Sequence, residues 1–213
     1  MISISRRASK QIFALLTVAC LSLSSARADV IFSDNFDADS HGVPATSLLN
    51  WNIDQPSVDV VGGGTHGALC NGNTAGNCLD MDGTPAGNGQ ITTKVGLNLA
   101  AGNYTFSFDY GNNSHNDNSL AWNIGSIVNG IVLTGVAQNN TYTNSSTSFT
   151  LASAMSGVFI TFTGGGTPSQ GGSVLDNVLL EGPSSSVPEP SMLVLLALGL
   201  MGLGSATRRK RLS

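Results

Sequence analysis

The sequence predicts an all-β fold, an antiparallel β-sandwich, over residues 29–182. Three observations predict it. This stretch shows no sustained helical periodicity. Short runs of alternating apolar and polar residues recur in it roughly every ten residues, and clusters of Gly, Asn, Ser and Thr separate the runs. Many short alternating strands joined by frequent turns are typical of a two-sheet sandwich.

Residues 1–28 have the composition of a secretory signal peptide. Three basic residues lie within the first ten positions, an apolar run covers residues 12–23, and Ala26-Arg27-Ala28 matches the small-x-small cleavage pattern. We expect cleavage between Ala28 and Asp29, so that the mature chain begins at Asp29. Lipoprotein processing at Cys20 is the alternative, but the residues before this cysteine lack the usual leucine.

The clearest strand is predicted over Asn103 to Tyr110, where aromatic residues occupy every second position. Because the side chains of a strand alternate between its two faces, Tyr104, Phe106 and Phe108 should point into the core together with Tyr110. Further strands are predicted over residues 31–36, 57–61, 120–124, 127–133, 158–163 and 174–181.

The predicted sandwich carries a strongly negative charge. Residues 29–182 contain twelve acidic residues and a single basic residue, Lys94, which gives a formal charge of −11. Nucleic-acid binding is excluded, because it needs clustered Lys and Arg to replace condensed counterions. With one cation there is little scope for salt bridges, so apolar burial and hydrogen bonds must hold the fold together.

Residues 191–213 predict a single transmembrane helix with a basic end. Residues 191–207 contain no charge, and 17 residues in a helix span ~26 Å, close to the ~30 Å of a bilayer core. The basic cluster that follows should stay in the cytoplasm, which leaves the acidic body on the outer side. This cluster consists of Arg208, Arg209, Lys210 and Arg211.

The sequence Pro188-Glu189-Pro190 stands directly before the apolar segment, within a linker over residues 183–190 that is rich in Pro and Ser. The order of Pro-Glu-Pro, apolar span and arginine-rich end resembles the PEP-CTERM sorting tail over residues 187–211. This resemblance implies a Gram-negative bacterium that makes exopolysaccharide, and processing of the tail near Pro-Glu-Pro by a membrane exosortase. It implies export across the inner membrane, temporary anchoring by the C-terminal helix, and a final place at the cell surface or outside the cell.

Several short segments of the body are similar to the ectodomain often found ahead of this tail. The resemblance implies a jelly-roll β-sandwich similar to galactose-binding-like and carbohydrate-binding modules, and it carries over no catalytic residue. The segments that carry it are Asp34 to Asp37, Leu49 to Trp51, Val58 to Val61, Leu79 to Gly83, Ala101 to Asp109 and Leu175 to Val178.

Cys70 and Cys78 are predicted to form a disulfide. They enclose a stretch rich in Asn and Gly that is able to turn back on itself. Export to an oxidising compartment favours the bridge, and two cysteines at this spacing do not make a zinc tetrad.

Asp80 and Asp82 are two residues apart, so on a strand they would face the same way. They could bind a cation or serve as the acid and base of a glycoside hydrolase. The Gly, Asn and Thr residues around them favour a cation, because a catalytic acid needs a desolvated carboxyl beside aromatic platforms. Asp34 and Asp176 are added because the first and last strands of a jelly roll often lie side by side. These four residues are the candidate calcium ligands.

Trp51, Trp122, Tyr142 and the Asn-rich loop over Gly111 to Ser119 could form a sugar-binding face, with core packing as the alternative for both tryptophans. The preferred hypothesis is an exported, non-catalytic surface or matrix protein associated with exopolysaccharide. The alternatives are a carbohydrate-binding module with a defined glycan and a secreted glycoside hydrolase that uses Asp80 and Asp82.

Overall fold

The structure is a computed structural model that describes residues 28–62, 70, 76–112, 118–133, 142–169 and 171–184. The predicted signal peptide before Ala28 and the predicted tail after Ser184 lie outside the described residues. The described part contains strands, turns and bends and no helix, so none of its segments is a helix of the length and apolar character needed to cross a bilayer.

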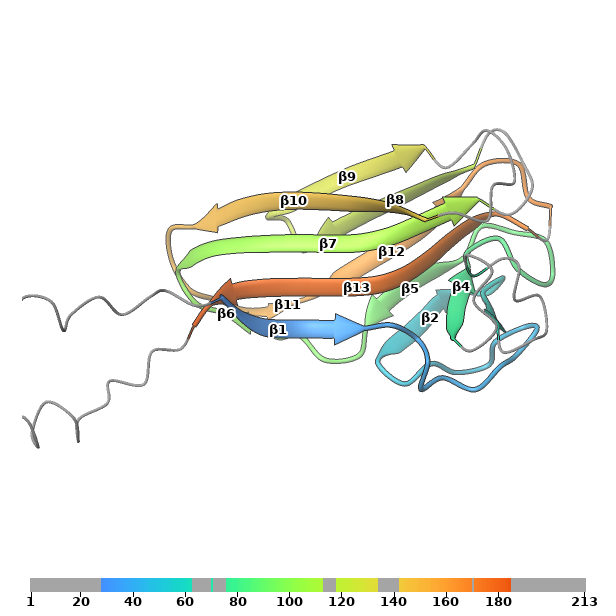
Figure 1. Cartoon of the computed structure of the whole chain (residues 1–213), viewed down its shortest axis with the longest axis horizontal. Coiled ribbons are helices and arrows are strands. Elements are labelled where there is room, and N and C mark those ends of the chain that lie inside the picture. Colours follow the sequence, from blue (N-terminus) through green and yellow to red (C-terminus); the bar gives the residue numbers. More distant parts are fainter. Residues whose placement is uncertain are drawn as a thin grey trace, which may run out of the picture. The chain divides into compact units, whose positions relative to one another are not determined.

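The described residues form an all-β, antiparallel sandwich of jelly-roll type, as predicted (Figure 1). The six-stranded sheet has the order β10 (Thr143–Leu151), β7 (Gly102–Asn112), β13 (Ser173–Pro183), β4 (Asn77–Asp80) and β3 (Asp59–Gly62), with β1 (Ala28–Asp34) also paired to β13. The five-stranded sheet has the order β2 (Trp51–Gln55), β5 (Gln90–Thr93), β12 (Ile160–Gly165), β8 (Ser119–Ile124) and β9 (Val128–Leu133). A two-stranded ribbon pairs β6 (Leu97–Leu99) with β11 (Met155–Val158).

Strand β7 forms because its alternate residues are aromatic, and the prediction for it is confirmed. Tyr104, Phe106 and Phe108 are all buried, whereas Tyr110 near the end of the strand is only partly buried. The core lies between the two sheets, where Phe108 meets Phe162 of β12 with ring centroids 5.1 Å apart. Aromatic contact across the two inner faces therefore joins the sheets.

Strand β13 changes its neighbour halfway along. Its first part pairs with β4 through Val174 and Leu175, and its second part pairs with β1 from Val178 onward. An irregularity in its pairing with β7 falls between these parts, where Asn177 has a φ of 49°. The first and last strands therefore lie side by side as predicted, and Asp176 stands at the point where the neighbour changes.

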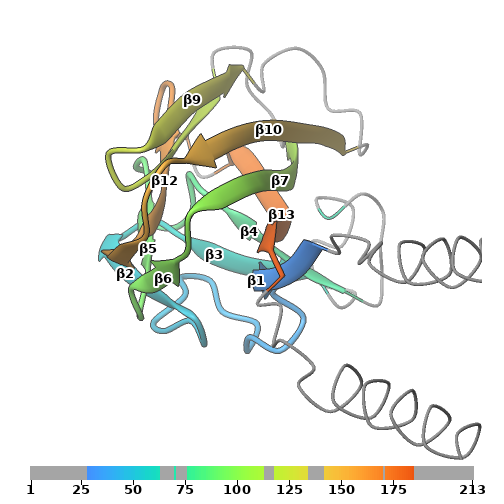
Figure 2. The same cartoon turned by 90° about the vertical axis from the view of Figure 1, so that its left-hand side faces the viewer.

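Both ends of the sandwich chain lie at the same end of the body (Figure 2). Ala28 is the first residue of β1 and is opposite Pro183, the last residue of β13. Cleavage before Asp29 would remove only the first residue of β1. Strand β13 extends one residue beyond Gly182, the predicted end of the domain.

Five strands are absent from the sequence-based prediction: β2, β4, β5, β6 and β10. One predicted strand, over residues 158–163, is divided in the structure. The chain leaves the ribbon at Val158 and enters the five-stranded sheet at Ile160, and the intervening Phe159 is 41% exposed. Alternation alone could not reveal this change of sheet.

We expect Phe162→Ala to lower the free energy of unfolding by about 3–5 kcal/mol, because it leaves a cavity between the sheets. The matched control is Ile131→Ala, at a side chain 67% exposed on β9, which should change stability by less than about 0.5 kcal/mol. Denaturant unfolding measures both. Similar losses in the two variants would contradict the placement of the core.

Candidate functional site

Asp80 and Asp82 are buried, and their carboxyls connect neighbouring loops by hydrogen bonds. Strand β4 ends at Asp80, and Asp82 lies beyond it. The two carboxyls therefore do not lie on one face of a strand, which differs from the arrangement expected from the sequence. Both residues are only 2% exposed. Asp80 Oδ1 accepts hydrogen bonds from the backbone N–H groups of Asp82 and Gly172, each at 3.0 Å. Asp82 accepts from the N–H of Gly87 at 2.9 Å and from the N–H and hydroxyl of Ser169 at 2.8 and 3.0 Å.

This arrangement fixes two loops to each other. Both carboxyls are almost fully buried and accept hydrogen bonds from backbone N–H groups of neighbouring loops. These contacts join the loop after β4 to the loop before β13.

Asp34 joins the end of β1 to the beginning of β2. Its Oδ1 accepts from the backbone N–H of Phe36 at 2.9 Å. Its Oδ2 accepts from the indole Nε1 of Trp51 at 2.8 Å and from the amide of Asn50 at 3.1 Å. Because Trp51 is 1% exposed, Asp34 satisfies the one polar atom of a core side chain.

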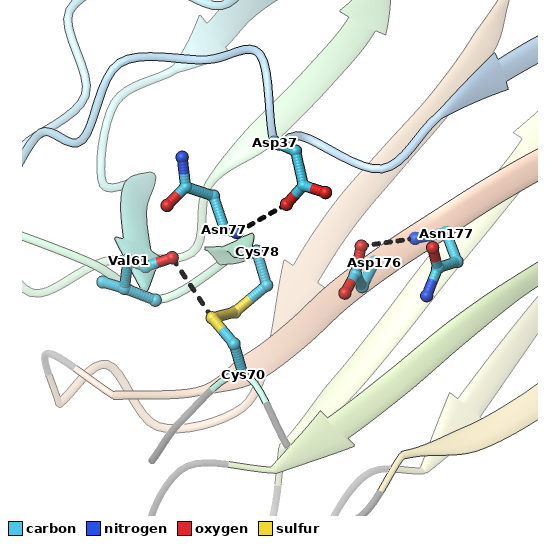
Figure 3. Close-up of a disulfide and its surroundings, with 7 residues drawn as sticks. All are labelled: Asp37, Val61, Cys70, Asn77, Cys78, Asp176 and Asn177. Carbon is cyan, nitrogen blue, oxygen red and sulfur yellow. Dashed lines mark hydrogen bonds between the residues drawn. A yellow bond between two sulfur atoms is a disulfide. The ribbon is translucent and has the colours of Figure 1, made fainter. Parts of the chain in front are cut away.

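The disulfide between Cys70 and Cys78 is confirmed (Figure 3). Both cysteines are buried, and they pack with Val61 and Val174 in a small apolar cluster separate from the main core. Cys70 Sγ lies 3.1 Å from the carbonyl oxygen of Val61. Next to Cys78, the backbone N–H of Asn77 donates to Asp37 at 2.8 Å. The disulfide therefore attaches Cys70 to β4, and Asp37 lies next to this part of the strand.

Asp176 is a buried carboxyl in an acidic environment. It is 8% exposed, and its Oδ1 accepts from the backbone N–H of Asn177 at 2.7 Å. Burial is the main cause that raises its pKa, to about 7, and the negative charges of Asp37 and Asp109 add to the shift. Burial and the charge of Asp176 also raise the pKa of Tyr142. Protonation of Asp176 therefore relieves charge repulsion in the folded protein.

The four predicted calcium ligands lie at three different places in the fold and do not form one cluster. Asp80 and Asp82 hold loops, Asp34 holds the β1–β2 connection, and Asp176 lies at the change of neighbour in β13. In the described part of the chain, no three His, Cys, Asp or Glu residues are grouped so that they could hold a metal ion. Calcium binding stays a prediction of the sequence.

The tryptophans belong to the core, as the second interpretation of the sequence expected. Trp51 and Trp122 are 1% and 5% exposed. The ring of Trp51 packs edge-on against Phe32 and Phe162, with centroids 5.3 and 5.9 Å apart. They are therefore unable to form an exposed stacking platform for sugars. Tyr142 is partly buried beside the disulfide, and residues 113–117 of the Asn-rich loop lie outside the described residues.

The outer face of the five-stranded sheet carries a continuous row of uncharged polar side chains. Cross-strand register aligns one residue from each strand, and we call this set the amide–hydroxyl row. In order across the sheet, it consists of Asn52, Thr92, Thr161, Asn123 and Asn129. Their sequence neighbours Trp51, Ile91, Trp122 and Phe162 are buried in the core, so the row faces outward.

The row has the chemistry of a hydroxyl-binding surface. The hydroxyls of Thr92 and Thr161 are 3.1 Å apart, and the amide of Gln90 donates to Thr163 at 3.1 Å in the neighbouring row. Asp54 is the sole charged residue in the five strands. Amides and hydroxyls both donate and accept hydrogen bonds, as sugar hydroxyls do. Sequence reasoning missed this surface because β2 and β5 were not predicted.

The C-terminal sequence matches the family described as the PEP-CTERM protein-sorting motif over residues 186–210. The chain carries a PEP-CTERM sorting motif. The match contains Pro188 to Pro190 and Arg208 to Lys210, and it ends one residue before Arg211. The PEP-CTERM motif indicates an exported, exosortase-processed protein of a Gram-negative bacterium that is membrane-anchored before processing. No curated protein sequence matches the chain.

Several solved structures resemble this chain weakly. TmCBM61, solved with β-1,4-galactotriose, is 14% identical, with 69% of this chain and 97% of that chain covered and a TM-score of 0.41. The CBM22-1 xylan-binding domain of Paenibacillus barcinonensis Xyn10C is 9% identical, with coverages of 76% and 100% and a TM-score of 0.45. The K1 cleaved adhesin domain of Lys-gingipain from Porphyromonas gingivalis is 12% identical, with coverages of 73% and 98% and a TM-score of 0.45. Similarities at this level say nothing of what this chain binds.

We expect the stability of the protein to fall as the pH rises from about 4 to 7. The pKa of Asp176 is about 7 in the folded state but about 3.9 in an unfolded chain, so the folded state binds more protons between these values. The contribution is complete below pH ~4 and is lost as the pH passes the folded pKa. Asp176→Asn should remove a slope of up to about 1.4 kcal/mol per pH unit and stabilise the protein at pH 8.

Thermal melts from pH 4 to 8 measure this effect. Asp54→Asn, at an exposed carboxyl on β2, is the matched control and should keep the slope of the unmodified protein. An Asp176→Asn variant with the same pH profile as the control would show that Asp176 does not take up a proton on folding.

Proposed function

We propose that this chain is an exported, non-catalytic protein of the cell surface or extracellular matrix that associates with exopolysaccharide after its tail is processed. The observation that carries the proposal is the amide–hydroxyl row, an uncharged polar surface five strands wide in a protein with a PEP-CTERM motif. A sheet face of this kind offers repeated donors and acceptors to a long neutral chain.

The negative charge of residues 29–182 favours a neutral polysaccharide segment as the partner over an anionic one. The formal charge of −11 over residues 29–182 repels an anionic polymer at distances within the Debye length. The row itself contains no charged group. A polymer that contacts several positions at once gains avidity although each single contact is weak.

The surroundings of Asp80 and Asp82 support a non-catalytic role. Both are almost fully buried, and both accept hydrogen bonds from backbone N–H groups of neighbouring loops. The two carboxyls that the sequence offered as acid and base are therefore occupied in holding those loops together.

Deletion of residues 191–213 should abolish attachment to the membrane and the cell surface, because these residues contain the predicted anchor and most of the sorting motif. Cell fractionation and immunoblotting measure the location, and mass spectrometry of the mature termini locates processing. Glu189→Ala should block processing near Pro188 and Pro190, whereas Glu181→Ala, at a glutamate of β13, should not. Normal surface attachment of the truncated protein would rule out sorting by the tail.

Thr92→Val/Thr161→Val should weaken association with exopolysaccharide at least about fivefold, because two hydrogen-bonding hydroxyls are lost from the centre of the row. Valine keeps the shape and the strand preference of threonine. The matched control is Thr105→Val/Thr150→Val, on the outer face of the six-stranded sheet. Co-sedimentation of the full-length protein with isolated exopolysaccharide, in calcium chloride and in EDTA, measures binding.

Equal binding by both double variants would reject the row as the contact surface. Binding that is lost in EDTA would make calcium part of the interaction. Release of reducing ends from the polysaccharide, abolished in Asp80→Asn/Asp82→Asn, would instead establish a glycoside hydrolase and overturn the non-catalytic proposal.

A further inference from the structure

A small pocket lies beside the edge of the five-stranded sheet, next to the start of β2 and the end of β5. Figure 1 shows these two strand ends. Its volume is about 290 Å³, and the loop over residues 38–49 forms most of its wall. The backbone N–H of Lys94 donates to the carbonyl oxygen of Asn50 at 2.9 Å, which holds the two sides of the pocket together. None of the sequence-predicted site residues lines it.

The pocket is lined by Asp39, and one oxygen of its carboxyl has no hydrogen-bond donor among the described residues. Asp39 is 7% exposed, and its Oδ1 accepts from the backbone N–H of Leu49 at 2.5 Å. Its Oδ2 is buried and has no hydrogen-bond partner in the described part of the chain. Burial raises the pKa of Asp39. A buried acceptor without a donor is unfavourable, so a ligand that supplies a donor here is stabilised.

Lys94, the one basic residue between residues 29 and 182, also lines the pocket. Its ammonium group donates to the carbonyl oxygen of Leu48 at 2.6 Å. This positive charge disfavours a metal ion or an amine in the same small space. Lys94 already has an acceptor, whereas Asp39 Oδ2 has no donor within the residues that the structure describes. The pocket can therefore accept a ligand with a neutral hydrogen-bond donor. A hydroxyl group is such a donor.

The remaining lining suits a sugar ring. Leu49 supplies an exposed apolar side chain, and Ser40 and Ser47 supply hydroxyls. A pyranose ring likewise combines an apolar C–H face with an edge of hydroxyls, and ligand sites usually combine apolar walls with a few polar groups. The volume is just below the ~300–1,000 Å³ typical of ligand pockets, which fits one ring rather than several.

We propose that this pocket binds one neutral sugar residue, at the end or at a branch of a polysaccharide chain. Asp39 accepts a hydrogen bond from one sugar hydroxyl, and Lys94 donates to an adjacent one. Entry of the ring requires the exposed side chain of Leu49 to move aside, so that a sugar hydroxyl reaches the buried Oδ2 of Asp39. This inference rests on the proposed function and adds a specific subsite to it: Asn52, the β2 member of the amide–hydroxyl row, lies three residues along the chain from Leu49, which lines the pocket.

The test uses the full-length protein in detergent and the methyl glycosides of glucose, galactose and mannose. Saturation-transfer NMR and calorimetry should detect at least one glycoside with a dissociation constant in the millimolar range. Asp39→Asn and Lys94→Met should each weaken that binding at least about tenfold, because each removes a charged hydrogen-bonding group. Asp54→Asn removes an exposed carboxyl of β2 that does not line the pocket, so it is the matched control and should bind as the unmodified protein does.

The outcomes separate this inference from the proposed function. If the protein sediments with exopolysaccharide but binds none of the three glycosides, or if Asp39→Asn and Lys94→Met bind as tightly as Asp54→Asn, the sugar pocket is rejected and the proposed function stands. If glycine binds and the glycosides do not, the pocket is one for zwitterions and the inference is wrong. If exopolysaccharide does not bind either, the proposed function fails as well. Lys94→Met changes an exposed side chain, so its result does not depend on whether Asp39→Asn folds.

Discussion

Aromatic packing between the two sheets is the interaction on which the rest of the structure depends. Phe106 of β7 meets Trp122 of β8 with ring centroids 5.1 Å apart, and Phe108 meets Phe162 at the same distance. Burial of each such side chain contributes ~1.5–3 kcal/mol, more than an exposed ion pair supplies. Among the described residues, most aromatic side chains pack in or against this core, and the outer face of the five-stranded sheet carries the amide–hydroxyl row.

Backbone N–H groups take the place of cations in this acidic body. Asp34, Asp80 and Asp82 each accept hydrogen bonds from the main chain, as does Asp59, which accepts from the N–H of Thr84 at 3.0 Å. Such bonds stabilise a carboxylate without a partner of opposite charge. Carboxyls that resemble a catalytic or metal-binding set in the sequence therefore connect loops by hydrogen bonds in the fold. Asp39 differs from them, because its Oδ2 has no hydrogen-bond donor in the described part of the chain.

The candidate surfaces were only partly predictable. Strands with aromatic or branched residues at every second position were found from the sequence, as β7 illustrates. Strand β10 was not, because Phe149 and Leu151 are its sole large apolar residues and its length is otherwise hydroxyls and amides. The row could not be found either, because Asn52 and Asn129 are joined by register across three intervening strands, and register depends on pairings that local patterns do not encode.

The sequence by itself determined the PEP-CTERM sorting motif, the antiparallel sandwich and the Cys70–Cys78 pair, because each follows from a local motif, periodicity or spacing. The tertiary structure decided which polar groups share a surface. It buried both tryptophans, placed Asp176 among other acids, and brought Lys94 to the carbonyl of Leu48 across 46 residues of chain. Contacts of this kind come from strand pairing and sheet packing, which join residues that are distant in the sequence.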